Sequence, residues 1–407
     1  MLKHDIVIIG GGAGGLAAAA SLLRRDPELD IAVIEPREFH DYQPGYTLIG
    51  AGVFNLSDVR RPMAKVMPRG VTWLRTSAKS LKPNINEVVL VTGVVVGYRI
   101  LIVATGNRLD FDAISGLTET LGKNGVTSNY RSDLAPYTWE LTQGLRAGRA
   151  LFTQPPMPIK CAGAPQKAMY LSANHWERTS VLRNIGVEFH SAAPTIFGVA
   201  DYVPALEETI ERYGIDPHFE SNLVAVDGRA RVATFRSAKG EITRSFDMLH
   251  VSPPQKPVEI VTNSLLADRA GYVDVDPMTL QHKHFANVFA LGDIGGMSNA
   301  KTAAAVRKQA PVVAENVEAV FAGESPHAIY DGYGSCPLTV EKGKILLAEF
   351  GYGGVLLPSF PKFVIDGTKP SRLAWHLKKD LLPAIYWDAM LKGREWLASP
   401  AEMTKAA

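Results

Sequence analysis

The sequence contains only two cysteines, Cys161 and Cys336, in 407 residues. A secreted fold held together by disulfide bonds needs more, so these thiols are expected to be catalytic, redox-active or inert. Cys161 follows the proline-rich residues 155–160, and Cys336 lies between Gly334 and Pro337. Glycine and proline are typical of loops, so the sequence predicts that both thiols are presented rather than buried.

Long apolar runs and a strong net charge are also missing. No stretch reaches the roughly 18 apolar residues that a membrane-spanning helix needs. The formal net charge is +2, which gives no electrostatic reason to expect nucleic acid as a partner. The chain enters an expected strand at Asp5, so no signal or transit peptide is predicted, and no metal site is predicted either. The length and the 46% hydrophobic content suit a compact protein of two or three domains.

The N-terminus carries a pattern typical of dinucleotide binding. Residues 5–9 are apolar and β-branched, which predicts a strand buried in a parallel sheet. A G-x-G-x-x-G turn at residues 10–15, a helix at about 16–25 and a strand at 31–34 follow, and that strand ends at Glu35. The glycines permit close approach of a pyrophosphate to the helix N-terminus. The Glu35 carboxylate accepts hydrogen bonds from ribose hydroxyls. A glycine-rich loop that merely packs a helix on a sheet is the alternative, but it leaves Glu35 unexplained.

Two later segments indicate that this dinucleotide is FAD. Residues 98–106 are expected to form a strand that ends in a small-residue turn, and residues 287–293 a strand that ends in Gly292 and Asp293. A long helix is predicted from about Lys301 to Ala322. Both segments resemble the flavin-side signatures of flavoproteins with two dinucleotide-type domains. In those proteins the Gly-Asp carboxylate meets the ribityl chain and the helix start faces the isoalloxazine ring.

A second glycine fingerprint, for a nicotinamide nucleotide, is absent from the middle of the chain. A strand at 149–153, a helix at 166–177 and a strand at 187–190 are predicted there, but residues 155–161 fill the turn with three prolines, a lysine and Cys161. Proline has no backbone N–H, so this turn offers no amide cradle for a pyrophosphate. The sequence therefore predicts a Rossmann-like unit that holds a thiol in place of NAD(P)H.

Positive charge surrounds the first cysteine. Lys160 is its neighbour, Lys167 lies one turn into the expected helix, and the helix N-terminus adds its dipole. These features favour the thiolate of Cys161. The alternative is a small buried hydrophobic residue, which is the common fate of free cysteine.

The C-terminal segment from about Ser371 mixes aromatic, aliphatic and basic side chains. Pro383 is predicted to split this segment into two short helices. Tryptophan and basic residues beside aliphatic ones are typical of a helix in a membrane interface. A helical hairpin that packs on its own domain, or a dimer contact, is the alternative.

Three long segments resemble sulfide:quinone oxidoreductases, in the class that includes the mitochondrial enzyme. They are residues 152–172, 301–305 and 330–350. Shorter matching segments are residues 35–36, 42–44 and 249–254. The resemblance implies an α/β fold with two Rossmann-like dinucleotide-binding-type domains and a C-terminal membrane-associating helical segment. The expected divisions are an FAD domain at 1–110 with a return segment at 266–330, a second Rossmann-like domain at 111–265, and a redox-cysteine and quinone region at 331–407.

The resemblance also implies a function. It predicts an FAD enzyme that oxidises sulfide and passes two electrons to a membrane quinone, with Cys161 and Cys336 joined at rest by a disulfide or a sulfur-inserted bridge. The persulfide is expected on Cys336 and the flavin-facing thiolate on Cys161, with the reverse assignment left open. Phe350, Tyr352 and the terminal aromatic residues are quinone-site candidates. The expected FAD-binding residues are Gly10, Gly12, Ala13, Gly14, Gly15, Glu35, Pro36, Gln43, Ala78, Ala104, Thr105, Gly106, Gly292, Asp293, Lys301 and Thr302.

The expected partners are sulfide, a membrane quinone, a small sulfur acceptor that the sequence does not name, and the membrane surface. The two-cysteine pattern without a leader favours a peripheral protein of the cytoplasmic membrane of a bacterium, and a homo-oligomer is left open. Three rival functions predict different behaviour. A type II NADH:quinone oxidoreductase would be reduced by NADH, the flavin subunit of a cytochrome c-reducing sulfide dehydrogenase would be exported, and a flavin-bound redox sensor would not turn over.

Overall fold

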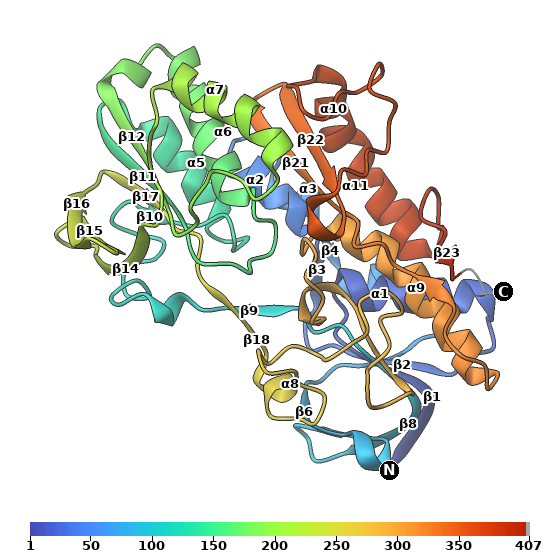
Figure 1. Cartoon of the computed structure of the whole chain (residues 1–407). Helices are drawn as coiled ribbons and strands as arrows, with labels where there is room; N and C mark the ends of the chain where they lie inside the picture. Colours follow the sequence, from blue (N-terminus) through green and yellow to red (C-terminus); the bar gives the residue numbers. More distant parts are fainter. Residues whose placement is uncertain (404–407) are drawn as a thin grey trace.

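The computed structural model describes residues 1–403, and one half of the molecule is built on a seven-stranded sheet (Figure 1). The strand order is β5-β2-β1-β8-β7-β6, and β19 pairs with β8. The strands β2, β1, β8 and β19 are parallel, and their carboxyl-terminal residues are buried, as expected for the βαβ unit predicted at the N-terminus. The strands are β1 (Leu2–Ile9), β2 (Ile31–Ile34), β5 (Thr72–Leu74), β6 (Ala78–Lys82), β7 (Glu87–Leu90), β8 (Val95–Val103) and β19 (Val288–Ala290).

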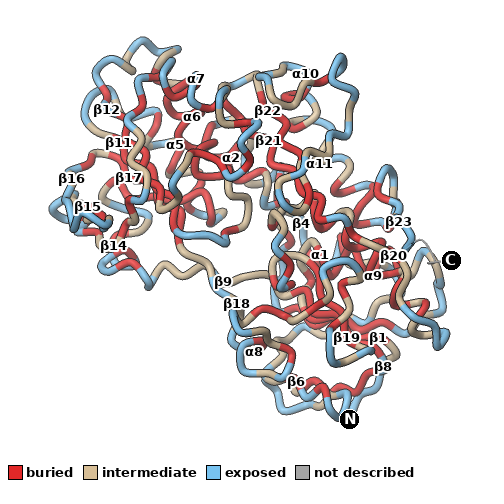
Figure 2. The backbone as a smooth tube through the Cα atoms, viewed as in Figure 1, coloured by how far each residue is buried: buried red, intermediate tan, exposed pale blue. Residues whose placement is uncertain are grey.

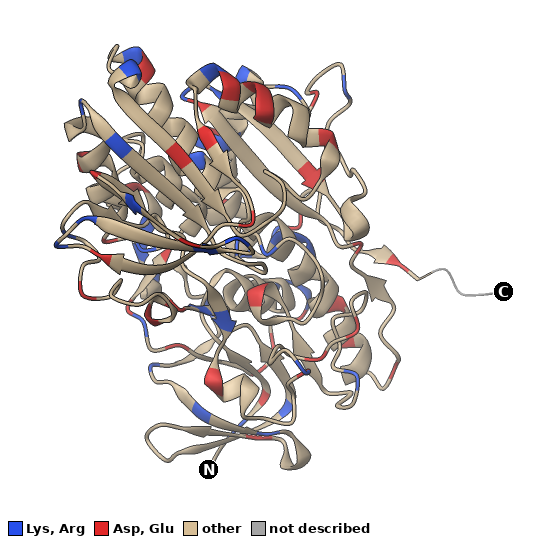
Figure 3. Cartoon of the chain, turned by 60° about the vertical axis from the view of Figure 1, so that its left-hand side comes forward, with Lys and Arg blue, Asp and Glu red and all other residues tan. Residues whose placement is uncertain are grey.

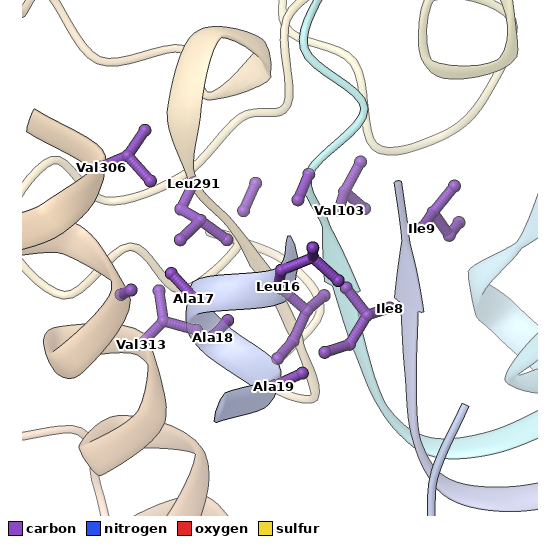
Figure 4. Packing of buried hydrophobic residues seen from close by; sticks show 14 of the residues in the cluster. Ile8, Ile9, Leu16, Ala17, Ala18, Ala19, Val103, Leu291, Val306 and Val313 are labelled. Atoms are coloured by element: carbon purple, nitrogen blue, oxygen red, sulfur yellow. The ribbon is translucent and has the colours of Figure 1, made fainter. Parts of the chain in front are cut away.

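Two helices pack together against this sheet. Helix α1 (Ala13–Arg25) lies between the strands and α9 (Ala303–Phe321), as Figure 4 shows for the side chains around Ala17 and Val313. The alanine-rich sequence of α1 lets the two helices approach closely, and Leu16 fills the space over the sheet beside Ile8. The N-termini of both helices therefore lie at the same edge of the sheet.

A second sheet forms the other half of the molecule and has the strand order β10-β17-β11-β12-β13, with all pairs parallel. Helices α5, α6 and α7 accompany it, and β14, β15 and β16 form a separate antiparallel sheet beside it (Figure 1). The bounds are β10 (Val126–Thr127), α5 (Ala135–Gly144), β11 (Gly148–Gln154), α6 (Ala164–Arg178), β12 (Ile185–Ser191), α7 (Val203–Tyr213), β13 (Asp216–His218), β14 (Asn222–Asp227), β15 (Val232–Ser237), β16 (Gly240–Ser245) and β17 (Met248–His250).

Two connections join the halves. Strands β9 (Asn107–Leu109) and β18 (Gln255–Pro257) run antiparallel to each other between the two sheets (Figure 1). Buried segments are concentrated in the sheets and in the helices that cover them (Figure 2). The remaining short elements are β3 (Phe39–Asp41), α2 (Tyr46–Ile49), α3 (Leu56–Val59), β4 (Arg60–Pro62), α4 (Met63–Val66), α8 (Glu259–Thr262), β20 (Ala328–Ile329) and β23 (Ala401–Glu402).

The second cysteine does not lie in a loop, so that expectation was wrong. Cys336 belongs to β21 (Gly334–Glu341), which forms a hairpin with β22 (Lys344–Phe350), and it is only 2% exposed. Pro337 is tolerated because β21 pairs with a single strand, and an edge position does not need every backbone N–H. The face of β21 that carries Cys336 packs on α6, and this contact buries the thiol.

The split predicted at Pro383 was also wrong. Helical backbone continues through α10 (Arg372–His376), η8 (Leu377–Leu381), α11 (Leu382–Ala384), η9 (Ile385–Ala389) and η10 (Met390–Lys392). The two π-helical segments, η8 and η9, flank the proline, and such wide turns let a helix absorb a residue that lacks an N–H. The run extends from β22 to α1, where the Gly393 backbone touches that of Ala20.

Basic and acidic residues, blue and red on the ribbon in Figure 3, are interspersed along the chain. This agrees with the nearly balanced composition of 43 basic and 41 acidic residues. Among residues 1–403, none of the helices combines the length and the apolar character needed to cross a bilayer.

Candidate active site

One large cavity connects the N-terminal sheet, the turn after β11 and the C-terminal helical run. Its volume is about 1740 Å³. Every residue predicted to bind FAD lines it except Gly15. Cys161, Lys160 and Lys167 line the same cavity, so the structure brings the first cysteine to the expected cofactor site.

The glycine turn after β1 has little room for side chains. Gly10 has φ of +102°, and a Cβ there would lie 2.5 Å from the Ala104 carbonyl oxygen. A Cβ on Gly15 would lie 1.9 Å from the Gly10 carbonyl oxygen, so Gly15 lets α1 begin close to β1 rather than touching the cavity. By contrast, Gly12 and Gly106 face open space in which a ligand can approach the backbone.

Glu35 is fixed by backbone groups at the end of β2. Its carboxylate accepts hydrogen bonds from the N–H of Gly11 at 2.8 Å and from the N–H of Arg37 at 2.8 Å, and it is 3% exposed. The Arg37 guanidinium also donates to both oxygens, from Nε at 3.1 Å and from a terminal nitrogen at 3.4 Å. The carboxylate is thus held in place at the cavity wall, where the sequence predicts a ribose.

Several polar groups in the cavity fit a dinucleotide. The buried side-chain amides of Asn107 and Asn129 line the cavity and have no hydrogen-bond partner among the described residues. Burial raises the pKa of Asp293, whose carboxyl group also lines the cavity. Helix α9 begins at the cavity with Thr302 as its cap, since the Thr302 hydroxyl accepts from the Ala305 N–H at 3.2 Å. These orphaned polar groups and the helix start suit FAD.

The two cysteines meet at the inner end of the cavity. Their Sγ atoms lie 3.7 Å apart, and both thiols are unbridged. The Lys167 Nζ lies 3.0 Å from the Cys161 Sγ and 3.7 Å from the Cys336 Sγ, and Lys167 is only 2% exposed. The S–S bond of a disulfide is about 2 Å long, so a small movement brings the two sulfurs to bonding distance.

The two thiols have opposite acidities. The hydrogen bond from Cys336, together with the Lys167 ammonium, holds the pKa of Cys161 well below its usual range. The same hydrogen bond, burial and the charge of Cys161 raise the pKa of Cys336. Burial alone would lower the pKa of Lys167, but the Cys161 thiolate outweighs it and keeps this lysine charged. The reduced pair therefore consists of a Cys161 thiolate that accepts a hydrogen bond from the Cys336 thiol.

The turn after β11 holds Cys161 in an uncommon backbone conformation. Its φ is +52°, which is rare for a residue with a side chain. The Cys161 N–H donates to the Lys301 carbonyl at 2.9 Å, and its carbonyl accepts from the Ala164 N–H at 2.7 Å. Gly163 makes room for the partner thiol, since a Cβ there would lie 2.6 Å from the Cys336 Sγ. These bonds orient the thiolate.

The β21–β22 hairpin separates two environments. Cys336 and Leu338 lie on the face that packs against α6, whereas Ser335 and Pro337 line the cavity from the other face. On β22, Leu347 also lines the cavity. Side chains alternate between the faces of a strand, so one ribbon presents a thiol on one side and an apolar wall on the other.

Comparison with known proteins gives the family. Residues 4–136 match the family model described as pyridine nucleotide-disulphide oxidoreductase. The mitochondrial sulfide:quinone oxidoreductase of Dictyostelium discoideum is 41% identical over 367 residues, which is 90% of this chain and 80% of that protein. The chain belongs to the sulfide:quinone oxidoreductase family. The corresponding Mus musculus protein is 38% identical over 99% of this chain and 89% of its own length.

A solved sulfide:quinone oxidoreductase from Aquifex aeolicus has the same fold. It superimposes with a TM-score of 0.81 at 18% sequence identity and covers 97% of this chain and 92% of that one. The chain therefore has an α/β fold similar to that of the Aquifex protein.

Lys378 is a residue of the site that the sequence did not single out. It lies in η8, is 3% exposed, and its Nζ donates to the Pro44 carbonyl at 3.3 Å. Burial, then the charge of Lys167, lower its pKa to about 8, and the Cys161 thiolate opposes this shift. It was visible in the sequence only as one of several tail lysines, because nothing local indicates that the tail folds back onto the cysteines.

Two of the quinone-site candidates, Phe350 and Tyr352, lie away from the cavity. The Phe350 ring packs edge-on against the Phe197 ring, with 5.9 Å between the ring centroids. The Tyr352 hydroxyl donates to the Pro277 carbonyl at 2.7 Å. Neither of them lines the cavity. The terminal aromatic residues Tyr386 and Trp396 do line it, and the apolar residues beside them are Leu347, Leu357, Phe360, Leu381, Leu382 and Ile385.

Outside the cavity, one group of side chains has metal-binding chemistry. Glu188, His190 and His218 bring their ligand atoms within 4.8 Å of one another beside β12 and β13. The Glu188 carboxylate, however, already accepts from the Nε of Arg149 at 2.9 Å and the Nε of Arg244 at 3.3 Å. The group therefore forms a partly buried ion-pair network in this structure.

Proposed function

We propose that this chain oxidises sulfide at the Cys161–Cys336 pair and passes two electrons through FAD to a quinone. The observation that carries the proposal is the 3.7 Å approach of the two sulfurs, with Cys161 on the wall of the cavity that also holds the FAD-binding residues. Bound FAD would accept the two electrons released at the cysteines and deliver them to the quinone. The relatives named above act, by their names, on the same two substrates.

The first step is thiol–disulfide exchange at the oxidised pair. Hydrosulfide attacks the Cys336 sulfur, the bond between the cysteines breaks, and Cys336 becomes a persulfide. Cys161 leaves as a thiolate. Lys167, 3.0 Å from that sulfur, stabilises the negative charge, which makes Cys161 the better leaving group of the two.

The second step returns the pair to its oxidised form. A nucleophilic sulfur acceptor takes the outer sulfur of the persulfide and leaves a Cys336 thiolate. The two thiolates then form a sulfur–sulfur bond and release two electrons. Cys161 faces the cavity and Cys336 lies behind it, which supports the assignment of the flavin-facing thiolate to Cys161 and of the persulfide to Cys336.

The C-terminal region is proposed to rest on the membrane. Large apolar side chains are exposed there, including Phe363 at 90%, Leu397 at 85% and Trp396 at 61%. Trp396, Leu397 and Leu381 also line the cavity. A lipid-soluble quinone could thus enter from the bilayer without crossing water, and the apolar patch is typical of a membrane contact.

Stopped-flow mixing tests the enzymatic proposal. Anaerobic mixing of the yellow protein with sulfide is expected to bleach the flavin, and a soluble ubiquinone analogue is expected to restore it. NADH in place of sulfide is expected to leave the flavin oxidised, because residues 155–161 offer no amide cradle. Reduction by NADH but not by sulfide would identify a type II NADH dehydrogenase, and reduction without turnover would identify a redox sensor.

Vesicle binding tests the membrane proposal. The double variant Phe363→Asp, Val364→Asp changes two exposed side chains that do not line the cavity. It is expected to lose cosedimentation with phosphatidylcholine–phosphatidylglycerol vesicles while keeping activity with a short-chain quinone. Ile242→Asp is the matched control, because Ile242 is exposed on β16, in a sheet remote from the tail. Equal vesicle binding by all three proteins would contradict the proposed contact.

A further inference from the structure

A buried carboxylate lies on the cavity face of the β21–β22 hairpin. Glu349 is 4% exposed and shares the face of β22 with Leu347, two residues earlier. The cavity wall also contains apolar side chains such as Leu357 and Phe360. A charged group in such a place is costly unless it is hydrogen-bonded, so its partners indicate what it does.

The partners of Glu349 form a short hydrogen-bonded chain. The Tyr333 hydroxyl donates to Glu349 Oε1 at 2.6 Å, and the Ser359 hydroxyl donates to the same oxygen at 2.5 Å. The Ser359 N–H donates to Oε2 at 3.0 Å, and the hydroxyls of Tyr333 and Ser359 lie 3.3 Å apart. All three residues line the cavity.

The chain runs from the interior to water. Tyr333 is 7% exposed, whereas Ser359 is exposed at the surface. No lysine or arginine donates a hydrogen bond to Glu349 among the described residues. Arg307 of α9 lines the same cavity and donates to the Trp396 carbonyl at 2.5 Å. Lys308 lies 5.9 Å from the Tyr333 ring.

Quinone reduction needs such a path. Conversion of a quinone to a quinol adds two electrons and two protons, one proton on each oxygen. The electrons come through the flavin, but an apolar slot open toward a membrane supplies no protons. Hydroxyl and carboxyl groups in hydrogen-bond contact can pass a proton along their chain.

We propose that Ser359, Glu349 and Tyr333 carry protons from water to the quinone oxygen. Bulk water gives a proton to the Ser359 oxygen as the Ser359 hydroxyl proton moves to the Glu349 carboxylate, and hydroxide stays in the solvent. The carboxyl group then passes a proton to the Tyr333 oxygen as the Tyr333 hydroxyl proton goes to the reduced quinone. After the complete relay all three groups regain their starting protonation, and no electrons have moved. The proposal rests on the proposed quinone reduction.

The test separates the two half-reactions in the FAD-loaded protein. In Glu349→Gln, flavin reduction by sulfide is expected at the native rate, while reoxidation by a soluble ubiquinone analogue slows about 100-fold at saturating quinone. Quinone affinity is expected to stay unchanged. Reoxidation by ferricyanide, which takes electrons without protons, is expected to stay at the native rate.

Two further variants complete the experiment. Tyr333→Phe is expected to slow reoxidation of the flavin by quinone in the same way. The solvent deuterium isotope effect on this reoxidation is expected to disappear in the variant. Glu341→Gln is the matched control, because Glu341 pairs with Arg212 and Lys344 at the far end of β21. Native quinone reoxidation in Glu349→Gln, or an equal slowing with ferricyanide, would overturn the proton path. Failure of sulfide to reduce the flavin of the unmodified protein would instead refute the proposed function.

Discussion

The turn after β1 and the turn after β11 occupy the same place in two similar βαβ units, but their residues differ in kind. The first is made of glycines and leaves its backbone open to a ligand. The second contains three prolines and ends in Cys161, whose N–H is already bonded to the Lys301 carbonyl. A shared scaffold thus supports a cofactor at one turn and a nucleophile at the other, because the end of a buried parallel strand is a rigid place to present either.

The largest expected effect comes from removing the nucleophile. Cys161→Ser is expected to lower sulfide-dependent quinone reduction by about 10³-fold or more, since a hydroxyl neither leaves as an anion nor forms the bridge. FAD content, measured as visible absorbance per protein, is expected to stay native because the first turn is untouched. Substantial flavin reduction by sulfide in this variant would contradict the assignment of the nucleophile to the turn after β11.

Glycine substitutions sharpen the same comparison. Gly163→Ala places a Cβ 2.2 Å from Leu338 Cδ2 and 2.6 Å from the Cys336 Sγ, so the sulfurs must separate. Turnover is expected to fall about 100-fold with FAD retained. Gly15→Ala clashes with the Gly10 carbonyl, and the expected result is a colourless protein that is less stable by about 1–3 kcal/mol. Loss of FAD in Gly163→Ala would show that the two turns are not independent.

Lys167 is expected to have a smaller effect. In Lys167→Met the Cys161 thiolate loses its nearest cation, so the pKa of Cys161 is expected to rise by about 1–3 units. The rate of iodoacetamide labelling of the reduced protein, followed against pH by mass spectrometry, reports this shift. Lys65→Met, on exposed α4, is the matched control. An unchanged pH profile would contradict the role of Lys167.

The smallest expected effect concerns Lys378. Its pKa is lowered to about 8, so it is charged at neutral pH and loses its charge as the pH rises through about 8. The thiolate is then less stabilised, and turnover is expected to fall on the alkaline side by about two- to fivefold. Lys378→Arg should move this fall to higher pH. If turnover of Lys378→Arg falls at the same pH as in the native protein, the loss of turnover is caused by the titration of another group.

Local patterns predicted both βαβ units but not the surroundings of Cys336. Strand β11, helix α6 and strand β12 cover the predicted residues 149–153, 166–177 and 187–190. The strand, glycine turn and helix at the N-terminus follow from residue spacing, and β2 spans the predicted residues 31–34. Cys336 was placed in a loop because Gly334 and Pro337 flank it, and a proline on an unpaired strand edge looks the same in sequence as one in a loop. The folding of the tail onto the cysteines, which brings Lys378 to the site, depends on long-range packing that no short window of sequence contains.

The alternation of side chains along β21 has a consequence for insertions. Moving the strand by one residue against β22 would turn Cys336 toward the cavity and Pro337 toward α6, so the thiol pair and the cavity wall would be lost together. The tight turn at Gly343, with φ of +110°, sets this register. Loops elsewhere can change length during evolution, but the number of residues in the β21–β22 hairpin has to stay the same.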